Sequence, residues 1–199
     1  MGILGIVQVG DPVLRQVARP LEPGEIGSPR IQQLIEDMRD TMRVAPGVGL
    51  AAPQIGESIQ LVVIEDPPAL LDSLSPEERE ARERDAVPFH VLVNPTLTVR
   101  TEEVVHAFEG CLSFAGFTMV VPRARKVRVE ALDENGQRFV KVAVGWYARI
   151  LQHEVDHLRG VVCCDRMESR TLSTGPNFTR HWRDVSVAEA RAALEKREP

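Results

Sequence analysis

The sequence predicts a single α+β domain in which antiparallel or mixed β-sheets wrap around one central helix. Residues 29–44 and 145–158 carry apolar side chains at the three- and four-residue spacing of a helix with a buried face. Between these two stretches lie short runs rich in β-branched residues and bounded by turn residues, which favour strands. The sequence shows neither an internal repeat nor a low-complexity linker, so residues 1–199 are interpreted as one domain.

The N-terminal quarter is predicted to hold an extended segment, a turn and one helix. Residues 6–9 are apolar or uncharged and precede Gly10-Asp11-Pro12, a typical turn sequence. Ser28 and Pro29 occupy the positions of an N-cap and a first helical residue. The apolar residues of the following helix, which recur every three or four positions, are Ile31, Leu34, Ile35, Met38 and Met42. The uncharged stretch 47–56 after it is a connector whose glycines permit close backbone approach to a ligand.

The middle of the chain is predicted to be mostly strands. Strands are expected at 59–64, 91–94, 97–105, 120–123, 126–131 and 138–144, with a turn at Asn94-Pro95 and a hairpin turn at 133–136. Residues 66–88 interrupt this pattern. They are bounded by prolines and carry a run of charges, which predicts a surface insertion with a helical turn beginning at Pro76.

The C-terminal part is predicted to begin with a largely buried helix that ends before Gly160. Its apolar stripe consists of Ala148, Leu151, Val155 and Leu158. A short strand is expected at 161–164. The tail, 170–199, is expected to end in an amphipathic helix from Ser186 to Lys196, with Ser186 as its cap.

The helix at 145–158 contains the sequence His-Glu-Val-Asp-His, an instance of H-E-x-x-H. Residues four apart lie on one helix face, so His153 and His157 would present two imidazoles to one metal ion. Glu154 could then reach a water on that metal without being a ligand. A catalytic metal needs a third protein ligand. The spacing leaves it open among the acidic residues and Cys111, Cys163, Cys164, His90, His106 and His181.

Composition excludes several other classes of protein. The net charge of −5 gives no basic footprint for nucleic acid. Apolar runs stay well short of the ~18 residues that span a bilayer. The N-terminus lacks the pattern of a secretory signal or transit peptide, which makes the cytoplasm the expected compartment. In that reducing compartment the three cysteines are expected to be thiols.

Three motifs together resemble the peptide deformylases. They are Gly-Val-Gly-Leu-Ala-Ala-Pro-Gln at 47–54, Glu-Gly-Cys-Leu-Ser at 109–113 and Gln-His-Glu-Val-Asp-His at 152–157. Val-Gly-Asp-Pro-Val-Leu-Arg at 9–15 is similar to the family's N-terminal segment, and the resemblance covers roughly residues 6–168. The continuation Leu-Ser-Phe-Ala-Gly-Phe at 112–117 is similar to that of organellar-like members.

The resemblance implies an enzyme that removes the N-formyl group from N-formylmethionine of nascent polypeptides and releases formate. By this likeness Cys111, His153 and His157 would bind one divalent metal. Fe²⁺ is the expected ion, and Zn²⁺, Ni²⁺ or Co²⁺ could occupy the same ligands. A metal-bound hydroxide would attack the formyl carbon, and Glu154 would act as general base and then general acid.

The resemblance also assigns the remaining site residues. Gln54 and the backbone N–H of Leu112 would stabilise the oxyanion. Gly49 would offer its backbone to a peptide substrate that pairs like an added strand. The side chains expected around the substrate methionine are those of Val48, Leu50 and Ile150. Expected partners are N-formylmethionyl peptides and, as nascent chains emerge there, the ribosome near its exit tunnel. Neither nucleic-acid sequence recognition nor membrane binding is expected. The missing transit-peptide pattern makes a bacterial cytoplasmic enzyme the expectation, with an organellar origin as the alternative if a transit peptide has been removed.

Two other functions fit part of the pattern. A zincin-type metallopeptidase shares H-E-x-x-H, but it normally takes its third ligand from a downstream His or Glu. His181 is the only downstream histidine, and its spacing matches no zincin pattern. A catalytically inactive relative that binds only metal or nascent chains is the second alternative. Hydrolysis of a formyl peptide would separate both from a deformylase.

Overall fold

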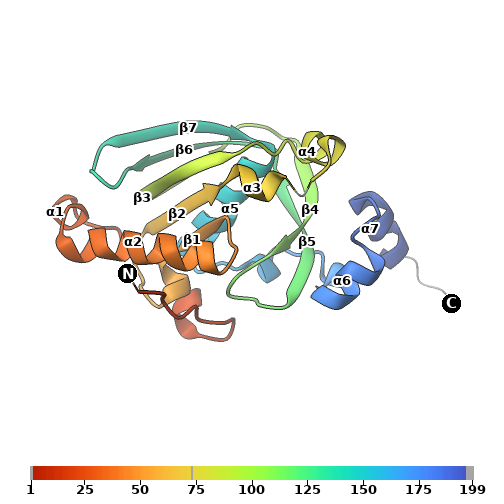
Figure 1. Cartoon of the computed structure of the whole chain (residues 1–199), viewed down its shortest axis with the longest axis horizontal. Helices are drawn as coiled ribbons and strands as arrows, with labels where there is room; N and C mark the ends of the chain where they lie inside the picture. Colours follow the sequence, from red (N-terminus) through yellow and green to blue (C-terminus); the bar gives the residue numbers. More distant parts are fainter. Residues whose placement is uncertain (1, 73, 196–199) are drawn as a thin grey trace.

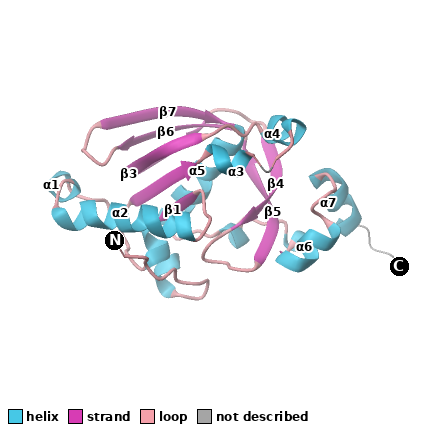
Figure 2. Cartoon of the chain, viewed as in Figure 1, coloured by secondary structure: helices cyan, strands magenta, loops and turns pink. Residues whose placement is uncertain are grey.

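The computed structural model, which describes residues 2–72 and 74–195, contains two antiparallel sheets with helices packed against them (Figures 1 and 2). The larger sheet has the strand order β1-β2-β3-β6-β7 and the smaller one has the order β4-β5-β8. The strands of the larger sheet are β1 (Gly49–Ala51), β2 (Leu61–Asp66), β3 (Val87–Val99), β6 (Lys126–Leu132) and β7 (Arg138–Val144). Those of the smaller sheet are β4 (Val104–Gly110), β5 (Phe117–Ala124) and β8 (Ser173–Thr174). The predicted α+β class is confirmed.

Two helices cover opposite faces of the larger sheet. They are α2 (Pro29–Val44) and α5 (Gly145–Leu158). Because side chains alternate along a strand, Leu61 and Val63 of β2 face the core beneath α2. Val62 and Ile64 face the core around α5. The sheet is therefore buried on both faces, and α5 lies between the larger sheet and β5 of the smaller one.

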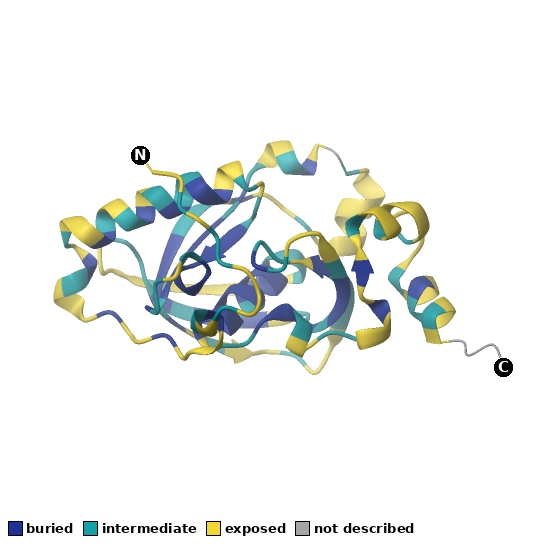
Figure 3. Cartoon of the chain, turned by 90° about the horizontal axis from the view of Figure 1, so that it is seen from below, coloured by how far each residue is buried: buried dark blue, intermediate teal, exposed yellow. Residues whose placement is uncertain are grey.

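The predicted helix at 29–44 is confirmed with its cap. The Ser28 side chain accepts a hydrogen bond from the backbone N–H of Ile31, and Pro29 is the first helical residue. Ile35, Met38 and Met42 are buried, while the outer face of α2 is exposed (Figure 3). A one-turn helix, α1 (Pro23–Ile26), precedes it.

The turn predicted at Asn94-Pro95 is wrong, because β3 runs through this position. The pairing register with β6 shifts between Val93 and Thr96, and Asn94 has a φ of 51°, so the strand bulges here without turning back. The Asn94 side chain accepts from the N–H of Leu21 and donates to its carbonyl, both at 2.8 Å. The continuous strand predicted at 97–105 is also wrong, since β3 ends at Val99 and β4 begins at Val104.

The strand predicted at 161–164 is wrong as well. Cys163–Asp165 forms a short 3₁₀ helix. The Asp165 carboxylate accepts a hydrogen bond from the backbone N–H of Val162 at 2.9 Å, which satisfies a backbone donor that a strand would have paired with a neighbour. Cys163 is buried in a cluster with Met119 and Val121 of β5.

Residues 66–88 connect β2 to β3 through two short helices. Asp66 belongs to β2, and Val87 begins β3. Between them lie α3 (Pro68–Leu71) and α4 (Pro76–Arg82). Ser75 caps α4, and no residue of α4 is buried. The helical turn predicted from Pro76 is present.

The C-terminal part forms α6 (Gly175–His181) and α7 (Val187–Glu195), which lie beyond the smaller sheet (Figure 1). The Ser186 hydroxyl accepts from the N–H of Glu189 at 3.2 Å, as expected for the predicted cap. Lys196, the last residue of the predicted tail helix, lies outside the described residues. Within the described part of the chain, no helix combines the length and apolar character needed to cross a membrane.

Candidate active site

The two histidines are carried by a helix that is held firmly in the core. The stripe predicted for α5, which includes Leu151 and Val155, is buried. Gly160 follows the helix with a φ of +71°, and a Cβ at this position would lie 2.6 Å from the Arg15 carbonyl oxygen. Only glycine fits this conformation and this close approach, so the end of α5 is fixed against the N-terminal segment.

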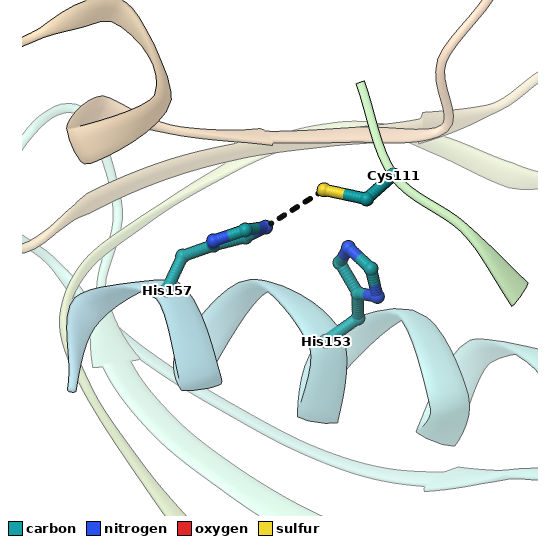
Figure 4. Close-up of side chains that lie close together, drawn as sticks. All are labelled: Cys111, His153 and His157. Carbon is teal, nitrogen blue, oxygen red and sulfur yellow. Dashed lines mark hydrogen bonds between the residues drawn. The ribbon is translucent and has the colours of Figure 1, made fainter. Parts of the chain in front are cut away.

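Cys111 lies directly after β4, and its thiol faces the two imidazoles of α5 (Figure 4). One potential ligand atom from each of Cys111, His153 and His157 lies within 4.8 Å of the others. Cys111 Sγ is 3.3 Å from His157 Nε2. Among the described residues, Cys111, His153 and His157 form the group whose side chains lie close enough together to hold a metal ion. The other histidines and cysteines considered from the sequence do not belong to this group.

Glu109 orients the first imidazole. Its carboxylate lies 3.1 Å from His153 Nδ1, which leaves Nε2 directed to the site. Burial alone would lower the pKa of His153, but the Glu109 hydrogen bond and nearby carboxylates raise that pKa to about 9. A cation would therefore have to compete with a proton for Nε2. Such a carboxylate–histidine pair is the usual support for a metal-binding imidazole.

The Glu109 carboxylate is itself held by two buried arginines. Arg123 donates to both of its oxygens at 3.0 Å, and Arg149 donates to one of them at 2.6 Å. Burial raises the pKa of Glu109, but hydrogen bonds from His153 and Arg123 outweigh it and hold that pKa far below its usual range. Arg123 also pairs with Asp156, so the network links β4, β5 and α5. Sequence reasoning did not assign Glu109 a role, although its position two residues before Cys111 places both side chains on one side of the chain.

Glu154 is buried beside this group. The residue is 4% exposed, and burial raises its pKa to about 7, with the charge of His153 opposing the rise. Its Oε2 and the Nδ1 of His157 are buried atoms without a hydrogen-bond partner among the described residues. Unpaired buried polar atoms are costly. A thiol, two imidazoles and an unpaired carboxylate oxygen at one point form a donor set that fits a divalent cation with a water beside it.

The Gln54 amide is oriented toward Cys111. Its Oε1 accepts from the N–H of Ala51 at 2.9 Å, so its NH₂ group faces the site. That NH₂ donates to Ser113 Oγ at 3.3 Å and lies 3.6 Å from Cys111 Sγ. Sequence reasoning did not anticipate Ser113 in this arrangement.

The N-terminal segment supports the Gln54 and Leu112 positions from outside. The N–H of Val7 donates to the Gln54 carbonyl at 2.9 Å. The Gln8 side chain donates to the Leu112 carbonyl at 3.0 Å and accepts from the N–H of Ala115 at 3.2 Å. Gln8 was not singled out from the sequence, because only the fold brings it to residues more than a hundred positions away.

A cavity of about 530 Å³ opens onto these residues. Its lining includes Cys111, Leu112, His153, Glu154, Gln54, Gly49, Val48 and Ile150. Of the three side chains expected around a substrate methionine, Val48 and Ile150 line this cavity. Leu50 is fully buried in the core on the α2 side and is not among the described lining residues.

Gly49 touches the carboxylate of Glu154. A Cβ built at Gly49 would lie 2.3 Å from Glu154 Oε1, so no side chain fits without displacing that carboxylate. This contact joins the edge strand β1 to the reactive part of the site. Gly49, the second glycine of the 47–56 stretch, therefore leaves space for the Glu154 carboxylate, which a glycine in a plain connector would not need to do.

The model for the polypeptide deformylase family matches residues 3–173. The chain belongs to this family. It is accordingly a hydrolase of the class that acts on N-formyl amides, in the N-terminal processing that accompanies translation. Its Cys-His-His group is a candidate site for the divalent metal on which deformylases depend.

Bacterial and organellar deformylases are both similar to the chain. It is 49% identical over 184 residues to peptide deformylase 1A, chloroplastic/mitochondrial, of Arabidopsis thaliana, an alignment covering 92% of the chain and 66% of that relative. Peptide deformylase 3 of Streptomyces avermitilis is 45% identical, with 97% and 84% covered. The solved class I type b deformylase of Acinetobacter baumannii with Met-Ala-Ser bound superposes with a TM-score of 0.74 at 32% identity, covering 83% of this chain and 99% of that one.

Replacing Gly49 with alanine is expected to lower kcat for deformylation by roughly 10²-fold, because a catalytic group displaced by about 1 Å loses that much. The added methyl group would push Glu154 from its position. Steady-state kinetics on a formyl peptide measure the change. Gly24→Ala is the matched control, since a Cβ there meets nothing within 4 Å. An unchanged kcat in Gly49→Ala would show that this contact does not position Glu154.

Proposed function

We propose that this chain removes the formyl group from N-formylmethionyl peptides, with Cys111, His153 and His157 holding one divalent metal. The observation that carries the proposal is the convergence of these three donors within 4.8 Å next to the buried, unpaired carboxylate oxygen of Glu154. A metal site with three protein ligands and an adjacent carboxylate is suited to hydrolysis.

The metal we propose is Fe²⁺, with Zn²⁺, Ni²⁺ or Co²⁺ able to use the same ligands. A thiolate makes the donor set softer than three nitrogen or oxygen ligands would, which favours transition metals over Mg²⁺ or Ca²⁺. When bound, the ion would supply Lewis acidity, which lowers the pKa of a water toward ~7 and polarises a carbonyl.

The chain's own groups would then carry the proton and the developing charge. Glu154 takes a proton from the attacking water and delivers it to the leaving amine of the methionyl residue. The Gln54 NH₂ and the Leu112 N–H donate to the formyl oxygen as it becomes negative. Loss of one such donor typically costs ~10²–10³ in rate. The Ser113 hydroxyl accepts from the same amide, and the Ala51 N–H bond to Gln54 Oε1 keeps the donor end of that amide toward the site.

The edge of β1 provides the surface for the peptide. Among the described strands, β1 pairs with β2 alone and so forms the edge of the larger sheet, and Gly49 lines the cavity. A substrate can add to this edge as an extended strand. Its methionine side chain would contact Val48 and Ile150, whereas Leu50 is buried in the core on the α2 side.

The proposed partners are nascent chains that carry N-formylmethionine, met near the ribosomal exit tunnel where they emerge. The proposed place of action is the bacterial cytoplasm. The similarity to the Streptomyces avermitilis deformylase over 97% of the chain supports a bacterial enzyme, and that to the Arabidopsis thaliana protein keeps an organellar one as the alternative.

Formate release from formyl-Met-Ala-Ser tests the proposal. The protein is loaded with Fe²⁺ under anaerobic conditions and compared on this peptide, on acetyl-Met-Ala-Ser and on an unmodified peptide. We expect formate from the first substrate and neither acetate nor internal cleavage from the others. Cleavage of an internal peptide bond without formate release would identify a metallopeptidase instead.

A further inference from the structure

Two cavities share one wall. The active-site cavity of about 530 Å³ and a second cavity of about 860 Å³ are both lined by Trp146 and Arg149 of α5. The second cavity lies between α4, β4 and the C-terminal region, where Phe178 of α6 and Trp182 directly after α6 also line it. The indole of Trp146 therefore forms part of the partition that closes the active-site cavity on this side.

The indole is held by a charged group from residues 66–88. The Arg84 guanidinium carbon lies 4.9 Å from the centre of the Trp146 ring. A guanidinium over an indole face is attracted by the ring's negative quadrupole. The indole Nε1 is buried without a hydrogen-bond partner among the described residues. The ring is therefore restrained by its contact with Arg84 and not by a hydrogen bond at Nε1.

Arg84 is rigid in turn. Its Nε and Nη2 donate to the two oxygens of Asp66 at 2.8 and 2.9 Å. The Arg84 side chain is 10% exposed, and that of Asp66 is fully buried. A bidentate pair of this kind fixes the plane of the guanidinium as well as its position. Asp66, the last residue of β2, thus sets the orientation of the Arg84 guanidinium plane that faces the indole.

The backbone fastens the same segment to the start of α5. The N–H of Trp146 donates to the Glu83 carbonyl at 3.4 Å. A Cβ at Gly145 would lie 2.3 Å from the Cβ of Glu83, so these two segments of the chain are in direct contact. The Glu83 carboxylate pairs with Arg125 at 2.8 and 2.6 Å. The residues after α4 are therefore anchored to the helix that bears Trp146.

We propose that Arg84 is a positioning residue that holds Trp146 as the end wall of the substrate side-chain pocket, and that residues 66–88 thereby limit the length of the first side chain accepted. This inference rests on the proposed function. A fixed wall excludes side chains longer than methionine, whereas a wall free to swing toward the second cavity would admit them.

The test compares two substrates of different length. Formyl-norleucyl-Ala-Ser matches methionine in length, and formyl-2-aminooctanoyl-Ala-Ser is two methylenes longer. Because Arg84→Met alone would leave Asp66 buried and unpaired, the variant is the double replacement Asp66→Asn with Arg84→Met. Trp146→Ala removes the wall itself. Arg79→Met, an exposed arginine of α4, is the matched control.

The quantity compared is the ratio of kcat/KM for the longer substrate to kcat/KM for the shorter one. In the double variant we expect this ratio to rise roughly tenfold, which is the low end of the discrimination that an apolar pocket achieves for one methylene group. The change should come mainly from KM. Trp146→Ala should raise the ratio at least as much, and Arg79→Met should leave it at the wild-type value. Metal content and thermal unfolding confirm that each variant is folded.

A second measurement reports on the wall without turnover. In a Trp182→Phe background Trp146 is the sole tryptophan, and acrylamide quenching of its fluorescence should increase when the Asp66–Arg84 pair is replaced. An unchanged substrate ratio in a folded double variant, or unchanged quenching, would overturn the inference. Absence of formate release by the wild-type protein would instead count against the proposed function, and the quenching result would still decide the role of Arg84.

Discussion

Glu154→Ala is expected to lose formate release by ~10²–10⁴-fold, the usual contribution of a general acid–base group, while the protein still binds its metal. The carboxylate is buried, and its Oε2 makes no hydrogen bond among the described residues, so removal of that oxygen leaves no partner unpaired. Metal analysis and steady-state kinetics on the same sample separate the two effects. Glu154→Gln keeps the shape but cannot accept a proton, and it should behave like the alanine variant.

Glu36→Ala is the matched control for this prediction. Glu36 lies on the exposed face of α2, so its replacement should change neither metal content nor turnover. If Glu154→Ala kept its activity, another group would have to carry the proton. If Glu154→Ala lost its metal instead, Glu154 would be a ligand.

Cys111→Ser is expected to weaken metal binding, because it replaces a thiolate ligand with a poorly ionised hydroxyl. The loss in affinity should exceed the roughly 10–100-fold that follows removal of a residue that only hydrogen-bonds to a ligand. Equilibrium metal competition under anaerobic conditions measures the change. The fold should persist, since Cys111 lies in the loop after β4 and is only partly buried.

Cys163→Ser and Cys164→Ser are the controls for the ligand assignment. Cys163 is the more demanding one, because it is buried with Met119 and Val121 of β5 in the apolar cluster against which Cys111 packs. Cys164 is partly exposed and faces Arg15. Both variants should retain the metal affinity of the wild type. Loss of metal from Cys163→Ser or Cys164→Ser, with retention in Cys111→Ser, would contradict the assignment.

The elements with strong local signals could be predicted from the sequence. Ser28 with Pro29 marked the start of α2, and Gly160 marked the end of α5. The four-residue spacing of His153 and His157 placed both imidazoles on one side of that helix. Each of these features depends on neighbours in the sequence, so no knowledge of tertiary structure was needed.

Features that depend on distant partners could not be predicted from spacing alone. The bulge at Asn94 is satisfied by Leu21, which is 73 positions away. Cys111 meets His157 across 46 positions, and only the resemblance to a known family selected it from the other candidate ligands. Glu109 was overlooked because its partners His153 and Arg149 lie on another element.

The pocket was predicted only in part for a related reason. Val48 and Leu50 were both expected at the pocket through the resemblance to the deformylases. The chain at this point packs Leu50 against the core beneath α2 and leaves Val48 at the cavity. The role of Arg84 was hidden within a charge run that resembles an ordinary solvated surface, because its partners Asp66 and Trp146 are brought to it by the fold.

The central claim, one catalytic metal held by Cys111, His153 and His157, is tested most directly by measuring bound Fe²⁺ and formate release together. Metal-free protein is titrated with Fe²⁺ under anaerobic conditions, and both quantities are recorded at each step. Formate release should rise in proportion to bound Fe²⁺, reach its maximum at one ion per chain and disappear on chelation. Full turnover by metal-free protein, or no turnover with one Fe²⁺ bound per chain, would contradict the account.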